Sequence, residues 1–152
     1  MLEEIKNFLL LGERIGTAGM PHAEQFKEIA QHGYRVVINL ALPTSTNSLS
    51  NEGELVSRES MTYVHIPVKF DTPEPADYEK FARMMDLFSK EKVFVHCAMN
   101  MRVSAFMFLY RVERGADRRE AEEAMKRVWE PDEVWRSFLN ERLRKVGKSE
   151  LI

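Results

Sequence analysis

Short apolar runs alternate along this chain with longer segments in which apolar residues recur every three or four positions. The runs are rich in β-branched residues and bounded by polar or Gly-containing segments, which is typical of strands. Continuous apolar runs of this kind indicate strands that are buried on both faces, as in a parallel sheet. The predicted strands are residues 8–12 and 14–19 as a hairpin or strand pair, 35–41, 61–68 and 92–96.

The segments between and after these strands have the spacing of helices. In the helix that opens at 72–76, for example, Tyr78, Phe81 and Met85 would share one face. Residues 103–112 are apolar almost all round, which predicts a buried helix. Further helices are expected over 22–31 with Pro21 in the first turn, near 54–59, over 119–129 with Asp117 as N-cap, and after Pro131.

Strands separated by helices predict an α/β fold with a central, mostly parallel sheet flanked by helices. The length of 152 residues is that of one ordinary domain, so we expect a single domain over residues 1–152. Ligands of such sheets bind beyond the carboxyl ends of the strands. The loops that follow Ala41, Val68 and His96 should therefore converge on one crevice.

One of these loops carries the most reactive residues. His96 and the only cysteine, Cys97, end a predicted strand, and Arg102 and Ser104 follow where a helix should begin. Loop N–H groups and a helix N-terminus together stabilise an anion. The pattern indicates a thiolate nucleophile beside an oxyanion site, with His96 orienting the loop through a backbone hydrogen bond. The alternative is that Cys97 is a small buried apolar residue, as most free cysteines are.

Composition sets modest bounds. Hydrophobic residues make up 44% and the net charge is -2, which describes a normal soluble globule with no broad field for nucleic acid or anionic membranes. The apolar run 8–11 is too short for a signal peptide or a membrane span. A single cysteine makes no internal disulfide and a thiolate needs a reducing compartment, so we expect the cytoplasm. The histidines lack metal-ligand spacing, so no metal is expected.

The segment HCAMNMRVS at 96–104 resembles the phosphate-binding loop of cysteine-dependent phosphatases of the tyrosine-phosphatase and dual-specificity superfamily. The signature of that loop is His-Cys, five residues, Arg, then Ser or Thr. Flanking segments resemble a small bacterial subgroup of the superfamily, and with the loop they cover nearly the whole chain. They are TAGMP at 17–21, VVINL at 36–40, YVHIPV at 63–68 and WEPDEVW at 129–135.

The spacing departs from that signature, because only four residues separate Cys97 from Arg102. Either the loop is one residue shorter or the arginine has moved, and we prefer the second reading, in which no gap is needed. Aligned without a gap, Asn100 takes the place of the family's loop glycine, Ser104 that of the serine, and Val103 that of the arginine. Asparagine tolerates the left-handed backbone conformation that a glycine supplies, so we expect the turn to survive. Arg102 would then reach the phosphate from one residue earlier.

The resemblance implies a phosphatase of dual-specificity fold that works through a cysteinyl-phosphate and needs no metal or cofactor. Cys97 would attack phosphorus, Arg102 would hold the phosphate oxygens, and Ser104 would assist departure from the thiolate. The substrate would be a phosphorylated protein or small molecule, with no nucleic acid and no membrane as partner. The expected phosphate-binding residues are Cys97, Ala98, Met99, Asn100, Met101 and Arg102.

A general acid is needed to protonate the leaving group. The resemblance implies an aspartate in the loop after Val68, and Asp71 is our candidate, with Glu74 and Asp77 as alternatives. The alternative, which the sequence favours equally, is that both acids are structural. Asp71 would then be a turn residue, and Asp77 an acid in the first turn of a helix.

Two rival functions stay open at the level of sequence. A binding-only pseudophosphatase would keep the anion site without turnover because its arginine is displaced. A rhodanese-like sulfurtransferase also uses a Cys-led loop with the shorter spacing to Arg, although His96 directly before Cys97 argues against it.

Overall fold

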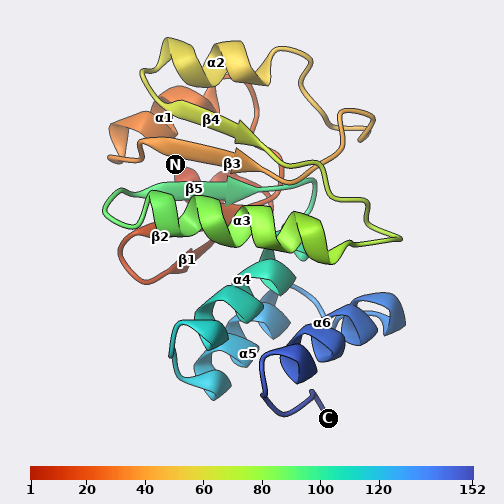
Figure 1. Cartoon of the computed structure of the whole chain (residues 1–152). Helices are drawn as coiled ribbons and strands as arrows, with labels where there is room; N and C mark the ends of the chain where they lie inside the picture. The colour runs from red at the N-terminus through yellow and green to blue at the C-terminus, as the bar shows by residue number, and fades with distance from the viewer.

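A five-stranded sheet lies between two groups of helices (Figure 1). The structure is a computed structural model that describes residues 1–152. Its strand order is β1-β2-β5-β3-β4; β1 is antiparallel to β2, and all other neighbours are parallel. The strands are β1 (Leu9–Leu11), β2 (Ile15–Ala18), β3 (Val36–Asn39), β4 (Thr62–His65) and β5 (Val93–His96).

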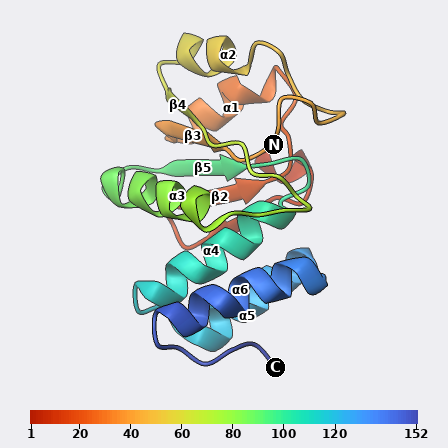
Figure 2. The same cartoon turned by 45° about the vertical axis from the view of Figure 1, so that its right-hand side comes forward.

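The helices divide between the two faces of the sheet (Figures 1 and 2). One face carries the 3-10 helix η1 (Leu2–Glu4), α1 (Gln25–Gln31) and α2 (Glu52–Arg58). The other carries α3 (Pro75–Leu87), α4 (Met101–Glu113), α5 (Arg118–Val128) and α6 (Glu133–Lys145). The predicted α/β fold with a mostly parallel sheet flanked by helices is therefore confirmed.

Both faces of the central strands are buried, as the continuous apolar runs predict. Successive side chains of a strand point to opposite faces. Ile38 and Val95 accordingly belong to a cluster of 29 buried residues shared with α3 to α6. Val37 and Phe94 belong to a second cluster, of 10 buried residues, shared with η1, α1 and α2.

Some predicted boundaries are wrong for local reasons. Pro21 does not open a helix, because α1 begins only at Gln25, whose side chain accepts a hydrogen bond from the His22 N–H at 2.7 Å. The strand predicted over 61–68 ends at His65, before Pro67, which has no N–H for the ladder. The chain beyond it still runs beside β3, since the Val68 N–H donates to the Leu40 carbonyl at 3.0 Å.

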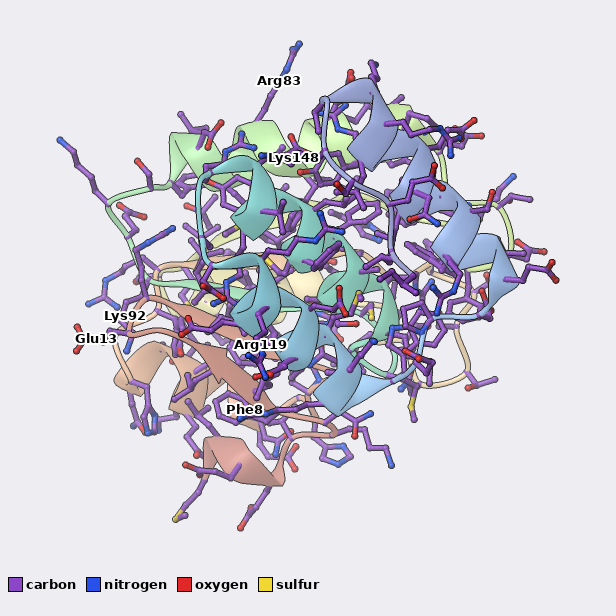
Figure 3. All side chains as sticks on the ribbon, turned by 90° about the horizontal axis from the view of Figure 1, so that it is seen from below. Phe8, Glu13, Arg83, Lys92, Arg119 and Lys148 are labelled. Carbon is purple, nitrogen blue, oxygen red and sulfur yellow. The ribbon has the colours of Figure 1, made fainter.

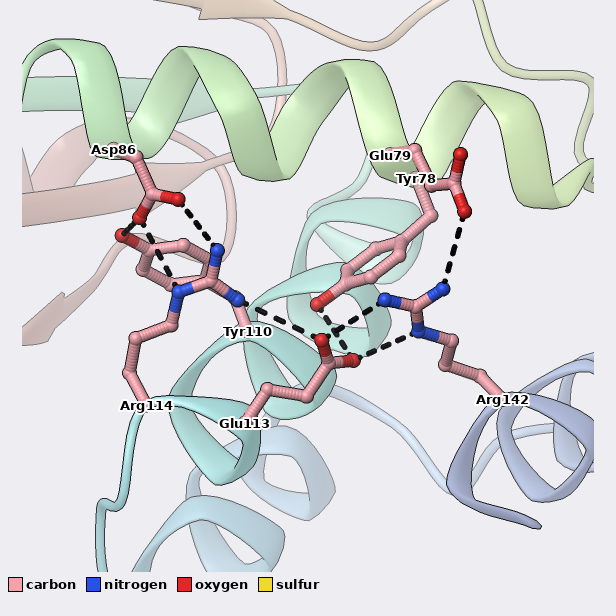
Figure 4. A network of polar contacts seen from close by, with 7 residues as sticks. All are labelled: Tyr78, Glu79, Asp86, Tyr110, Glu113, Arg114 and Arg142. Carbon is pink, nitrogen blue, oxygen red and sulfur yellow. Dashed lines mark hydrogen bonds and ion pairs between the residues drawn. The ribbon is translucent and has the colours of Figure 1, made fainter. Parts of the chain in front are cut away.

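A network of seven polar side chains fastens α6 and α3 to the end of α4 (Figure 4). At its centre the Glu113 carboxylate accepts two hydrogen bonds from Arg142, at 3.0 and 3.1 Å, and one from the Tyr78 hydroxyl at 3.0 Å. Burial and the Glu113 charge raise the pKa of Tyr78, so its hydroxyl stays protonated and keeps donating. The members are Tyr78, Glu79, Asp86, Tyr110, Glu113, Arg114 and Arg142.

The outer surfaces of the helices are polar. Arg83, for instance, extends from α3 away from the molecule (Figure 3). The predicted cap of α5 is confirmed, because the Asp117 carboxylate accepts a hydrogen bond from the Glu120 N–H at 2.9 Å. No helix combines the length and the apolar character that crossing a membrane requires.

Candidate functional site

The loop that carries Cys97 lies at the centre of one edge of the sheet. It joins β5, which lies between β2 and β3, to α4, whose first residue is Met101. Cys97 is fully buried, and its N–H donates to the Ala18 carbonyl at 3.3 Å. The chain leaving β3 reaches the same place, since the Leu40 N–H donates to the His96 carbonyl at 2.8 Å. The expected meeting of loops at the carboxyl edge of the sheet is thus observed for these segments.

Three successive carbonyl groups of the loop are held by neighbouring parts of the chain. A ring nitrogen of His96, Nδ1, lies 3.2 Å from the Cys97 oxygen. The Ala98 oxygen accepts hydrogen bonds from the Met20 N–H and the Asn47 side-chain amide, both at 3.2 Å. The Met99 oxygen accepts one from the Asn7 side-chain amide at 2.9 Å. All of these carbonyls therefore bond to groups outside the loop.

The direction of these carbonyls fixes the direction of the N–H groups that follow them. Every peptide bond of the chain is trans, so the C=O and N–H of each peptide unit point in opposite directions. Several N–H groups of the loop and of the first turn of α4 donate to no protein acceptor. Unclaimed N–H groups at the start of a helix form a binding site for an anion. They belong to Ala98, Met99, Met101, Arg102 and Val103.

Asn100 makes the turn between the loop and α4. It is fully buried and has φ of 68°, in the left-handed region, as expected for a residue in the place of a glycine. Its side-chain amide donates to the Asn7 carbonyl at 2.8 Å and to the Thr17 hydroxyl at 3.2 Å. The turn is thereby tied to β2 and to the N-terminal segment.

Arg102 is the second residue of α4, and it is 6% exposed. Its Nη1 donates to the Val68 carbonyl at 2.9 Å, and its guanidinium carbon lies 5.9 Å from the centre of the Phe70 ring. Its Nε is buried and has no partner in the protein. Val103, which the ungapped alignment puts in the place of the family's arginine, is fully buried in the larger core cluster. The side chain at that position therefore faces the core and not the loop.

Ser104 does not make the contact that the sequence predicts. Its hydroxyl donates to the Met101 carbonyl at 2.7 Å and accepts a hydrogen bond from the indole N–H of Trp129 at 3.0 Å. It forms no hydrogen bond with Cys97. The hydroxyl is thus engaged by the helix turn and by Trp129, and its expected bond to the thiolate is absent.

His96 is fully buried and bonded through both ring nitrogens. Nδ1 faces the Cys97 carbonyl, in agreement with the expected backbone hydrogen bond. Nε2 lies 2.5 Å from a carboxylate oxygen of Glu52, the first residue of α2, which is itself 3% exposed. Glu52 was not among the predicted site residues.

The three candidate general acids lie in the segment from the end of β4 to the start of α3. Asp71 is exposed and accepts a hydrogen bond from the Thr72 hydroxyl at 3.4 Å. Asp77 lies in the first turn of α3, where burial chiefly, and the Glu74 charge in addition, raise the pKa of its carboxyl against the opposing effect of Lys80. None of the three bonds to the Cys97 loop.

The position of Asp71 is nevertheless constrained by its neighbours. The Phe70 carbonyl accepts a hydrogen bond from the Trp135 indole at 2.7 Å, and the Phe70 ring packs beside Trp129 and Trp135. Since Val68 is bonded to Arg102, the stem of this loop is fixed beside the guanidinium.

The structure groups no three His, Cys, Asp or Glu side chains in a way that could hold a metal ion.

Comparison with known proteins places the chain in a family. Residues 13–137 match the model of a family described as a DSP-PTPase phosphatase fused to NAD+ kinase. The chain is a member of this phosphatase family. A protein from Shewanella putrefaciens CN-32 described as "Putative phosphatase (DUF442)" has a similar structure, with 31% identity, a TM-score of 0.85 and coverage of 96% of this chain and 97% of the other.

Two further proteins are similar to this chain, one in sequence and one in fold. A beta-lactamase hydrolase-like protein of Xylella fastidiosa is 29% identical over 118 residues, which are 76% of this chain. The chain spans only 27% of the length of that protein. TpbA of P. aeruginosa, solved in complex with pTyr, shares the fold with a TM-score of 0.64 at 16% identity, and covers 79% of this chain and 72% of its own.

Proposed function

We propose that this member of the phosphatase family hydrolyses a phosphomonoester through a cysteinyl-phosphate intermediate on Cys97. The observation that carries the proposal is the set of unclaimed N–H groups that follows Cys97 at the start of α4. A phosphoryl group placed there would have its oxygens facing N–H donors and its phosphorus beside the sulfur. Preorganised donors of this kind stabilise the charge that develops in the transition state.

In this mechanism the Cys97 sulfur attacks phosphorus and the ester oxygen leaves with the electron pair of its bond to phosphorus. A water molecule then attacks the cysteinyl-phosphate, and the sulfur leaves as thiolate. Phosphate is released and the enzyme returns to its starting state. No metal or cofactor takes part in the proposed steps.

Arg102 supports the proposal through the edge of its guanidinium that remains free. Nη1 is bonded to Val68, but neither Nε nor Nη2 donates to a protein acceptor. Nε and Nη2 lie on one edge of the planar group and can bind two oxygens of one phosphate in parallel. We infer that the shorter spacing to Cys97 leaves Arg102 able to hold the phosphoryl group.

Asp71 and Ser104 have supporting roles in this mechanism. We infer that Asp71 protonates the leaving oxygen, because its loop is anchored beside Arg102 through Val68 and Phe70. Ser104 would act on the loop and not directly on sulfur, since its hydroxyl bonds Met101 and Trp129. The substrate class is a phosphorylated protein or small molecule.

A binding-only role is the second candidate, favoured by the bond that holds Arg102 on the Val68 carbonyl. Hydrolysis of para-nitrophenyl phosphate by the wild type and by Cys97→Ser separates the two functions. We expect turnover by the wild type and none by the variant, which should still bind inorganic phosphate because the N–H groups remain. Phosphate binding without turnover in the wild type would leave the binding-only role.

A further inference from the structure

Glu52 is a buried carboxylate whose two oxygens both bond to side chains. Oε2 lies 2.5 Å from Nε2 of His96, and Oε1 accepts a hydrogen bond from the Asn39 amide at 3.2 Å. The Asn39 amide cannot be turned round, because its own oxygen accepts the Ala41 N–H at 2.8 Å. Glu52 is only 3% exposed, and a carboxylate so buried is costly unless its oxygens are paired in this way. Its partner His96 lies forty-four positions away in sequence.

The positions of protons in this cluster follow from the partners. The Cys97 carbonyl only accepts, so Nδ1 of His96 must carry a proton to bond it. One further proton lies in the contact between Nε2 and Glu52, on either partner. Both arrangements leave Nδ1–H directed at the Cys97 oxygen. Without Glu52, a neutral ring could carry its one proton on Nε2, and the bare Nδ1 would then face the carbonyl oxygen.

The bond from His96 sets the direction of a single peptide unit. The Cys97 carbonyl and the Ala98 N–H belong to the same trans peptide and point in opposite directions. Holding that carbonyl on His96 therefore aims the Ala98 N–H, the first donor after the nucleophile, to the other side. The Ala98 N–H has no protein acceptor.

We propose that Glu52 is a positioning residue: it holds the His96 ring with Nδ1–H on the Cys97 carbonyl and so aims the Ala98 N–H at the bound oxyanion. The inference rests on the proposed function in that the oxyanion is the phosphoryl group of the substrate. Asn39 and Tyr63 extend the support, since the Asn39 amide also donates to the Tyr63 hydroxyl at 3.0 Å. Burial raises the pKa of Tyr63 to about 12, which keeps that hydroxyl neutral. The hydrogen bond from Asn39 opposes this rise, and the charge of Glu52 adds to it.

Two substitutions separate positioning from other effects of Glu52. In Glu52→Gln the new amide can donate to Nε2 of His96 while its oxygen accepts from Asn39, so Nδ1–H stays on Cys97. In Glu52→Ala both bonds are lost. We expect Glu52→Ala to weaken inorganic phosphate binding and to lower kcat/KM for para-nitrophenyl phosphate by about tenfold or more, the loss of one hydrogen bond to a charged group. Glu52→Gln should stay within about threefold of the wild type on both measures.

Control variants account for the burial of Glu52. Glu54→Gln changes an exposed acid on the same helix, which pairs with Arg58 and touches neither His96 nor the loop. Leu143→Ala creates a cavity in the buried core near the C-terminal end of α6. It should lower the urea midpoint without changing phosphate affinity in the folded protein. The proposal is overturned if Glu52→Ala binds phosphate as tightly as Leu143→Ala does. It is also overturned if Glu52→Gln and Glu52→Ala lose the same amount of phosphate affinity and kcat/KM.

A spectroscopic measurement reads the ring directly. In ¹⁵N-labelled protein, the Nδ1–H resonance of His96 should be present and slowly exchanging in the wild type and in Glu52→Gln, and weakened or faster exchanging in Glu52→Ala. An unchanged Nδ1–H signal in Glu52→Ala overturns the role of Glu52. A wild type that binds phosphate but does not hydrolyse the aryl ester contradicts the proposed function alone, because the spectrum and the phosphate affinities still decide the role of Glu52.

Discussion

The side-chain amide of Asn100 donates a hydrogen bond to the carbonyl oxygen of Asn7, 2.8 Å away. Asn7 in turn donates from its own side chain to the Met99 carbonyl, at 2.9 Å. Both asparagines have left-handed backbone, with φ of 52° at Asn7 and 68° at Asn100. Each asparagine therefore forms a turn in the backbone, and its side chain bonds the N-terminal segment to the Cys97 loop.

Two substitutions at Asn100 separate these contributions. Asn100→Gly keeps the left-handed turn but loses the bonds to Asn7 and Thr17, whereas Asn100→Ala loses the bonds and adds the strain of a Cβ at positive φ. We expect both variants to unfold at lower urea concentration than the wild type, with Ala about 1 kcal/mol less stable than Gly. Equal stability of the two would mean that the backbone at position 100 relaxes out of the left-handed region.

An exchange of neighbours tests the spacing of the loop. The ungapped alignment suggests that Arg102→Val combined with Val103→Arg restores the family signature. Because Val103 is fully buried, the exchange puts a guanidinium among the apolar side chains of the core. We expect a loss of about 3 kcal/mol or more in the free energy of unfolding and no gain in turnover.

Arg102→Val alone is the control for that exchange. It should fold with a somewhat lower urea midpoint than the wild type, because the Val68 carbonyl loses its buried donor. Phosphate affinity should fall because the guanidinium is gone. An exchange variant that folds normally and hydrolyses aryl phosphate faster than the wild type would show that position 103 faces the site.

The fold was predictable because its signals are local. The β-branched runs and the amphipathic spacings identify strands and helices wherever burial is strong, as in β3, β5 and α3. Predictions failed at ends, where one residue decides the outcome. Pro67 interrupts the ladder after β4, and a Gln25 side chain takes the His22 N–H in place of a helical turn at Pro21.

The candidate site could be predicted only where its residues adjoin Cys97 in sequence. His96, Cys97 and Arg102 stand out because they share one short segment. Glu52 and Asn7 give no such signal, since one is an acid in the first turn of a short helix and the other a polar residue before a strand. Their importance comes from contacts across more than forty positions, which spacing in a single sequence does not reveal.

Ser104 illustrates the opposite error. In the ungapped alignment it takes the place of the signature serine, which predicts a bond with the thiolate. The Trp129 indole, from the end of α5, takes that hydroxyl instead. A motif gives the position of a side chain along the chain, but competing donors from distant elements decide which partner it has.

The ion pair between Asp86 and Arg114 should make stability depend on pH. Hydrogen bonds from Arg114 first, and from Tyr110 second, lower the pKa of Asp86 below its usual value of 3.8. A carboxyl with a lowered pKa in the folded state stabilises the fold above its unfolded pKa, and this contribution disappears as the pH falls through the folded pKa. Asp86 is 53% exposed, so the contribution at pH 7 should be below about 1 kcal/mol.

Asp86→Asn is the corresponding test. Urea unfolding should show the variant less stable than the wild type at neutral pH, and the difference should shrink in acid below the usual carboxyl range. A difference that persists undiminished in acid would assign the effect to packing of the side chain and not to its charge.

The identity of the general acid can be read from the dependence of rate on the leaving group. Phenyl phosphate needs protonation of its leaving oxygen far more than para-nitrophenyl phosphate does. If Asp71 is the acid, Asp71→Asn should slow phenyl phosphate hydrolysis by roughly a hundredfold or more and affect the nitrophenyl ester much less.

Asp77→Asn is the matched comparison, because the raised pKa of Asp77 also keeps a proton available on that carboxyl over a wider pH range. A selective loss in Asp77→Asn and not in Asp71→Asn would transfer the role to the first turn of α3. Equal losses on both esters in Asp71→Asn would mean that this residue only shapes the loop, and Glu74 would then be substituted in the same way.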